Sequence, residues 1–153
     1  MIEADRSGTA VAVVLWEEAK MINQDIIDTM VRMAKEARNN AHAPYSEKAV
    51  GACVLADDGT LYGGCNVENA SFGLSCCAER VAIYRAIADN KRNFDAIAVV
   101  ADTPEPITPC GACCQVMAEF DIRDVIMANL KGDLQVIDIY DLAPYAPGKR
   151  NEK

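Results

Sequence analysis

Two short cysteine clusters constrain this chain more than any other feature of its sequence. They are residues 77–80 (CAER) and residues 109–113 (PCGAC). Three thiolates can bind a zinc ion and leave its fourth position to water, which distinguishes a catalytic zinc site from a closed structural one. A carboxylate two residues after the first thiolate can reach that water and move its protons. The clusters therefore predict a catalytic zinc site built from Cys77, Cys110, Cys113 and Glu79.

Both clusters are predicted to lie at helix N-termini. The C-x-x-C spacing places the second pair of thiols on one face of a first turn, and Pro109 favours an entry turn just before it. Ser75 is expected to cap a helix over Ala78–Ala88. Helix N-termini favour thiolates. Because three thiolates outweigh the charge of one zinc ion, these N-termini and Arg80 are expected to compensate the excess.

Two other interpretations of the cysteines stay open at this point. A lone C-x-x-C is often a redox pair, and buried cysteines are often only small apolar residues. Cys76 and Cys114 lie beside the expected ligands, so a structural zinc site with four thiolates is also conceivable. Neither alternative gives Glu79 a role, which favours catalytic zinc.

The pattern of apolar residues predicts one α/β domain over residues 21–147. An amphipathic helix is followed by a hairpin, and then helices alternate with strands, which implies a mixed five-stranded sheet covered on both faces. The clusters would then meet beside the strand ends. The expected elements are helices over 21–38, 78–88 and 110–120, and strands over 50–55, 61–66, 96–101, 124–128 and 134–139, with a turn at 57–59.

Composition and chain ends restrict the possible partners. The net charge is −8, which disfavours a nucleic-acid polymer, and no apolar run approaches the ~20 residues of a membrane span. Seven cysteines without a secretory signal favour a reducing cytoplasm. Residues 1–20 form an extension of unknown role, residues 148–153 are expected to be a loose tail, and His42, the only histidine, is expected to be an exposed loop residue.

With these residues in view, the chain resembles the cytidine deaminase family, in particular the small homotetrameric type with three cysteine ligands. The likeness runs from about Asn23 to Pro147. It implies a three-layer α/β/α fold, one Zn²⁺ per subunit and hydrolytic deamination of cytidine or deoxycytidine in pyrimidine salvage. Its strongest stretches are residues 64–73 (GCNVENASFG), 77–80 (CAER), 109–113 (PCGAC) and 115–120 (QVMAEF).

The resemblance also implies a role for each matching residue. The three cysteines of the clusters would bind zinc. Glu79 would take a proton from the attacking water, pass it to the ring N3 and then protonate the departing amine. Asn66 and Glu68 would hold the sugar hydroxyls, for which an amide and a carboxylate supply donors and acceptors. Ala78 would offer its backbone N–H to the pyrimidine O2, and Ala70 a backbone contact to the sugar.

Several positions facing the substrate depart from the family pattern. Lys48 stands where the family has an aromatic residue that packs against the nucleoside, and Ala49 replaces a proline. Pro147 stands where a phenylalanine would stack on the base in the segment that closes the pocket, and Tyr145 is a possible substitute. Loss of two stacking surfaces removes on the order of 1–3 kcal/mol each.

Two further departures concern the subunit interface and the charge at zinc. Phe72 stands where a tyrosine reaches into the neighbouring subunit's site, and Cys114 replaces an arginine that tempers thiolate charge.

These departures from the family pattern leave two alternatives to cytidine deamination. One is the same chemistry on a modified cytosine nucleoside or another aminated ring, with Lys48 facing an acidic or carbonyl group. The other is a non-catalytic, zinc-stabilised nucleoside-binding protein.

Overall fold

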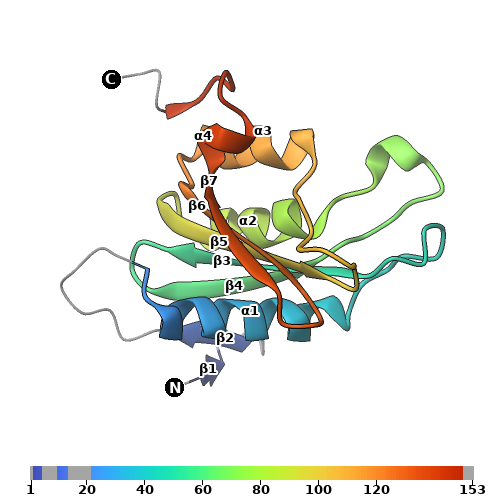
Figure 1. The fold of residues 1–153 in the computed structure, drawn as a ribbon, viewed down its shortest axis with the longest axis horizontal. Coiled ribbons are helices and arrows are strands. Elements are labelled where there is room, and N and C mark those ends of the chain that lie inside the picture. The colour runs from blue at the N-terminus through green and yellow to red at the C-terminus, as the bar shows by residue number, and fades with distance from the viewer. Residues whose placement is uncertain (1, 5–9, 14–21, 150–153) are drawn as a thin grey trace.

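The computed structural model describes residues 2–4, 10–13 and 22–149 and shows a central sheet with helices on both faces (Figure 1). This is the predicted three-layer α/β/α arrangement. The elements in chain order are β1 (Ile2–Ala4), β2 (Ala10–Val13), α1 (Gln24–Arg38), β3 (Val50–Ala56), β4 (Thr60–Cys65), a 3-10 turn η1 (Phe72–Leu74), α2 (Ala78–Ala88), β5 (Phe94–Ala101), α3 (Gly111–Glu119), β6 (Asp124–Asn129), β7 (Leu134–Asp138) and α4 (Ile139–Leu142).

The sheet has the strand order β1-β2-β4-β3-β5-β6-β7, in which only β5 and β6 run parallel. The five strands from β4 to β7 form the predicted mixed sheet. The extension adds two short strands at the β4 edge, where Ala12 pairs with Leu61. The rest of it (residues 1, 5–9 and 14–20) lies outside the described residues. In the described part of the chain, no helix has the length and apolar character needed to cross a bilayer.

Of the helices in the described residues, α1 alone covers one face of the sheet. The helix begins at Gln24, three residues later than predicted, because the Asn23 side chain caps it by accepting the Ile26 N–H at 3.0 Å. Met21, the predicted start, lies outside the described residues. Its apolar side, including Met30 and Ala34, packs on residues of β3, β4, β5 and β6. Gly51 permits close approach, because a Cβ there would lie 1.9 Å from the Ala34 carbonyl oxygen.

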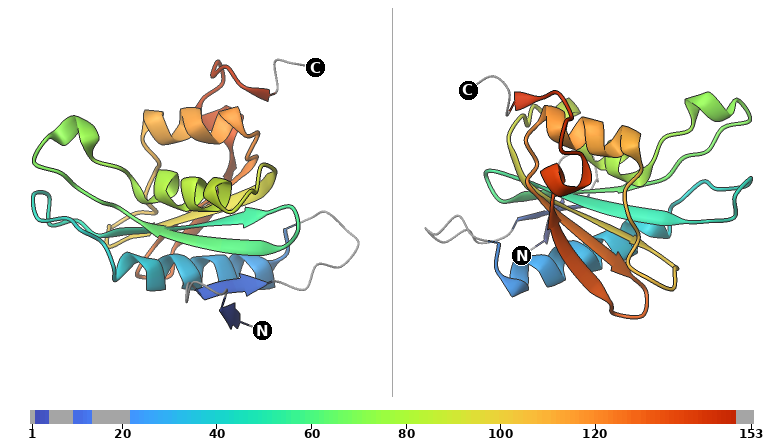
Figure 2. Two further views of the ribbon diagram at one scale, coloured as in Figure 1. Left: turned by 180° about the vertical axis from the view of Figure 1, so that it is seen from behind. Right: turned by 45° about the horizontal axis from the view of Figure 1, so that its top comes forward.

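Helices α2, α3 and α4 cover the opposite face (Figure 2). Alternate residues of the same strands point to this side, so β3 sends Val54 to this core and Cys53 to the α1 core. Helix α4 is a difference from the prediction, which extended the last strand through Ile139. The reason is Asp138, whose carboxylate accepts the Tyr140 N–H at 2.8 Å and starts a helical turn.

Asn129 joins the end of β6 to the loop that leads to α3. The residue is fully buried. Its amide nitrogen donates to the Pro104 carbonyl at 3.1 Å and to the Asp133 carboxylate at 2.8 Å. Its oxygen accepts the N–H groups of Lys131 and Asp133, both at 3.0 Å. All four hydrogen-bonding positions of the side chain are therefore used.

Replacing Asn129 with alanine is expected to lower the free energy of unfolding by roughly 2–4 kcal/mol, because four hydrogen bonds of a fully buried side chain are lost. Urea unfolding of the zinc-loaded protein measures this change. Asn40→Ala, at an exposed position after α1, is the control and should stay within about 0.5 kcal/mol of the parent. Equal unfolding midpoints for the two variants would contradict the assignment.

Candidate active site

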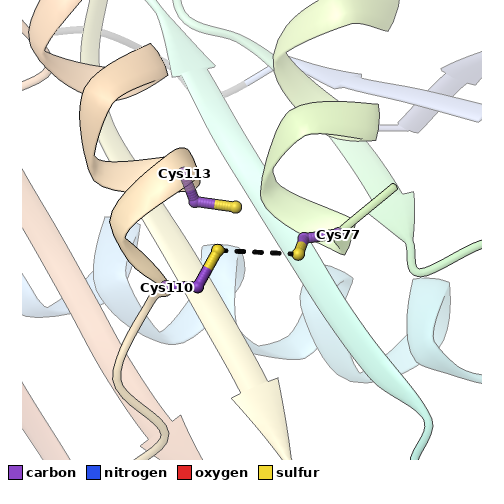
Figure 3. Close-up of side chains that lie close together, drawn as sticks. All are labelled: Cys77, Cys110 and Cys113. Carbon is purple, nitrogen blue, oxygen red and sulfur yellow. Dashed lines mark hydrogen bonds between the residues drawn. The ribbon is translucent and has the colours of Figure 1, made fainter. Parts of the chain in front are cut away.

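The three predicted ligands meet where α2 and α3 begin (Figure 3). Their sulfur atoms all lie within 4.8 Å of one another, and the sulfurs of Cys77 and Cys110 are 3.8 Å apart. Zn–S bonds of about 2.3 Å in a tetrahedron give an S···S separation of about 3.8 Å, so the sulfur spacing fits zinc. Cys113 is buried and Cys110 is exposed, which leaves one side of the cluster open.

The first two ligands occupy the N-cap positions of their helices. Cys77 precedes α2 and Cys110 precedes α3, both with extended backbone and without a side-chain capping bond. Their thiols are therefore available to a metal beside the positive ends of two helices. The prediction that Ser75 caps α2 is wrong. Ser75 ends η1, and its hydroxyl accepts the Asn69 N–H at 3.1 Å.

Hydrogen bonds distribute charge among the thiols. A bond with the Cys113 thiol, supported by the Arg80 guanidinium, lowers the pKa of Cys77. The same bond and burial raise the pKa of Cys113. Arg80 donates to the Cys77 sulfur at 3.2 Å, and its buried Nε has no hydrogen-bond partner among the described residues. Arg80 is thus placed to offset thiolate charge, as expected.

Glu79 lies in the first turn of α2 beside the thiols and is only 4% exposed. Burial raises the pKa of Glu79 to about 7. A carboxyl group whose pKa lies near neutrality can both accept and release a proton, which suits general acid–base catalysis. The burial of a carboxylate beside a metal-binding cluster has no evident packing function.

The two neighbouring cysteines stay outside the sulfur cluster. The Cys114 sulfur contacts the Pro109 carbonyl at 3.8 Å, and Cys76 pairs through its backbone with Val67. Within the described chain, only Cys77, Cys110 and Cys113 form a group able to hold a metal. The geometry thus gives no support to a four-thiolate site.

Asn66 and Glu68 lie just beyond the end of β4, on either side of Val67, which pairs with Cys76. The Asn66 amide accepts the Val50 N–H and donates to the Lys48 carbonyl, both at 2.8 Å. One Glu68 carboxylate oxygen accepts the N–H groups of Tyr45 and Ser46, both at 3.1 Å. The strand that leads to them packs tightly on α2, because a Cβ at Gly64 would lie 2.4 Å from the Ala82 nitrogen.

The comparison with known proteins decides the family. Residues 24–129 match the family model described as the cytidine and deoxycytidylate deaminase zinc-binding region. The chain belongs to the cytidine deaminase family. The match to a zinc-binding region agrees with the three clustered sulfurs on zinc as the cofactor.

Individual relatives match most of the chain. It is 46% identical over 127 residues to the cytidine deaminase of Sporosarcina psychrophila, covering 82% of this chain and 93% of that protein. It is 49% identical over 119 residues to the cytidine deaminase of Halalkalibacterium halodurans, covering 76% and 90%. The crystal structure of cytidine deaminase from Burkholderia pseudomallei superposes with a TM-score of 0.76 at 48% identity, covering 78% and 98%.

The other residues singled out by the family resemblance range from buried to exposed. Ala78 is buried at the start of α2, where the first N–H groups lack helical partners, and Ala70 is exposed in the segment before η1. Lys48 is exposed. Phe72 is 72% exposed and touches Tyr45 edge-on, with ring centroids 5.5 Å apart. The ring therefore faces outward from the chain that carries it.

The C-terminal segment packs along α3. The Gln115 amide donates to the Pro147 carbonyl at 2.8 Å, and a Cβ at Gly148 would lie 2.2 Å from the Ala118 oxygen. Gln115 and Ala118 both follow the last of the three clustered cysteines on this helix. Tyr145 is 95% exposed, so in this structure it does not close the pocket. Of the predicted loose tail, residues 150–153 lie outside the described residues.

Asn129 and Ser46 are the residues near the site that the sequence did not single out. Asn129 fastens the loop that leads to Cys110, and the Ser46 hydroxyl accepts the Lys48 N–H at 3.1 Å. An asparagine followed by Leu-Lys-Gly-Asp is a turn signal, but the contact with Pro104 is long-range. His42 is exposed, as predicted.

Proposed function

We propose that this protein is a zinc-dependent hydrolase that converts cytidine or deoxycytidine into uridine or deoxyuridine and ammonia. The observation that carries the proposal is the sulfur cluster of near-tetrahedral spacing with the buried Glu79 beside it. The relatives named cytidine deaminase support the choice of substrate. Glu79 also argues against the non-catalytic alternative, because a structural zinc site needs no buried carboxylate.

The proposed mechanism assigns proton transfer to Glu79. The three thiolates would hold zinc, which would supply the Lewis acidity that makes water a better acid and nucleophile. Glu79 takes a proton from the attacking water and delivers it to the ring N3 as the C4–O bond forms. Glu79 then takes the remaining water proton and passes it to the amine, so that the C4–N bond breaks and ammonia leaves. No oxidant or reductant is needed.

Substrate binding is assigned to residues that follow β4 and to the first residue of α2. We propose that Asn66 and Glu68 bind the sugar hydroxyls, that the Ala78 N–H donates to the pyrimidine O2, and that Ala70 offers a backbone contact to the sugar. Amide and carboxylate groups supply the donors and acceptors that a diol needs. The position of Ala78 at a helix start leaves its N–H without an intrahelical partner.

A homotetramer in the cytoplasm is the proposed working form. The outward ring of Phe72 and the exposed Tyr45 and Leu74 support assembly, because contiguous exposed apolar groups mark interaction surfaces. In such an assembly Phe72 would line a neighbouring subunit's pocket. Seven cysteines, all free, suit a reducing compartment.

Lys48 favours a second candidate substrate. Its exposed side chain extends from a backbone position bonded directly to the Asn66 amide. The Lys48 cation beside Asn66 suits a modified cytosine nucleoside, or another aminated ring, that bears an acidic or carbonyl group.

Ammonia release from the zinc-loaded protein tests the proposal. With cytidine and with deoxycytidine, we expect one ammonia per uridine or deoxyuridine formed, and removal of zinc with a chelator should abolish the release. Aminated heterocycles and cytosine nucleosides with acidic substituents complete the panel. Equal or faster turnover of one of these would favour the second candidate. No release from any substrate with zinc bound would overturn the proposed activity.

A further inference from the structure

The 43–50 loop is held in place by the two side chains that are proposed to bind the sugar. We use this name for residues 43–50, which precede and begin β3. Glu68 accepts the N–H groups of Tyr45 and Ser46, and Asn66 bonds to the backbone of Lys48 and Val50. The 43–50 loop and the segment that carries η1 extend beyond the sheet at the same end of the molecule (Figure 2).

Few other contacts fix the outer part of this loop. Residues 44–48 are exposed. Glu47 has a positive φ of 57°, which is uncommon for a residue with a side chain, and its N–H bonds back to Ala43 at 3.0 Å. Arg38 donates to the Ala49 carbonyl at 3.0 Å, close to the point where β3 begins. Apart from the Tyr45–Phe72 ring contact and the bond from Asn66 to the Lys48 carbonyl, the outer residues of the loop therefore depend on Glu68.

Glu68 can hold the loop and a sugar hydroxyl together. Both backbone bonds use the same oxygen, Oε1. A carboxylate has two oxygens with about four acceptor directions, so a hydroxyl can be accepted without releasing the loop. Desolvation raises the pKa of Glu68, but the hydrogen bonds from Ser46 and Tyr45 together outweigh it, so the net shift is downward and the group stays an ionised acceptor.

We propose that Glu68, assisted by Asn66, is a positioning residue that couples the sugar to the 43–50 loop. A bound nucleoside whose hydroxyls contact this pair fixes the carboxylate in the orientation that holds the loop in place. The held loop keeps Lys48 beside Asn66. By linkage, a docked loop in turn favours nucleosides over free bases. The coupling to sugar rests on the proposed function, whereas the anchoring of the loop does not.

Amide hydrogen exchange of the zinc-loaded protein tests the anchoring without any substrate. Peptides spanning residues 43–48 report on the N–H groups of Tyr45 and Ser46. Glu68→Ala should accelerate their exchange by at least about tenfold, whereas Glu68→Gln, which keeps an acceptor oxygen, should stay within about threefold of the parent. Glu36→Ala is the control and should have no effect. Glu36 is exposed on α1, which covers the face of the sheet opposite α2 and α3. Unchanged exchange in Glu68→Ala would overturn the proposal.

Uridine, the proposed product, tests the coupling. Saturating uridine should slow exchange of the same peptides by at least about fivefold in the parent, and uracil, which lacks the sugar, should not. Uridine that binds by calorimetry but leaves exchange unchanged would overturn the coupling alone. Absence of uridine binding together with absence of ammonia release would overturn the coupling and the proposed function. Normal ammonia release by the parent protein, together with unchanged exchange in Glu68→Ala, would overturn only the present inference.

Discussion

Replacing Glu79 with glutamine is expected to lower kcat for ammonia release by about a thousandfold or more while zinc stays bound. Glutamine keeps the size of the side chain in its buried place but neither accepts nor releases a proton near neutral pH. All proton transfers of the proposed mechanism pass through this group, so each is lost at once. Steady-state ammonia release, with zinc content measured by elemental analysis, gives both quantities.

The matched control for this substitution is Glu36→Gln. Glu36 is an exposed carboxylate that pairs with Arg32 on α1, on the far side of the sheet from the thiols. Its kcat should equal that of the parent. If Glu79→Gln retained more than about a tenth of the parental kcat with full zinc content, Glu79 would not be the proton carrier.

Replacing Gly64 with alanine is expected to produce the largest structural effect on the site. The added Cβ would lie 2.4 Å from the Ala82 nitrogen and 2.6 Å from the Ala78 oxygen. Both are backbone atoms of α2, so the helix has to move away from β4, and it carries Cys77 and Glu79 with it. We expect a loss of about 3 kcal/mol or more in the free energy of unfolding and at least a tenfold weaker zinc affinity.

Gly73→Ala provides the comparison for Gly64→Ala. A Cβ at Gly73 meets nothing within 4 Å, so stability and zinc affinity should match the parent. Urea unfolding and competition with a chromophoric chelator measure the two quantities. Parental zinc affinity in Gly64→Ala would show that α2 can shift without disturbing its ligand, against the tight packing described above.

The zinc cluster and the five strands of the mixed sheet could be predicted because their signals are local. The C-x-x-C spacing fixes a helical turn, and short apolar runs mark strands that are buried on both faces, such as β3 and β5. Strand boundaries differ by one or two residues, as at β3, which ends at Ala56 rather than Leu55.

The features that escaped prediction depend on contacts between distant residues. Ser75 has the right residue type for a helix cap, but its hydroxyl accepts the Asn69 N–H, and the N-cap of the helix is Cys77, two residues later. The place of the C-terminal segment depends on the bond from Gln115 to the Pro147 carbonyl and on the close approach of Gly148 to Ala118, which no local pattern in either segment predicts. Likewise, the bonds between Glu68 and the 43–50 loop join residues more than twenty positions apart.

The cysteines at the starts of α2 and α3 set a limit on how stable this fold can become. Serine or aspartate at an N-cap usually stabilises a helix by about 0.5–2 kcal/mol, and neither Cys77 nor Cys110 makes such a bond. Selection for thermal stability alone would favour exchanging both, and each exchange would remove a metal ligand. At each helix start, a stabilising cap and a metal-binding thiol thus require different side chains at the same position. In this chain both positions carry the thiol.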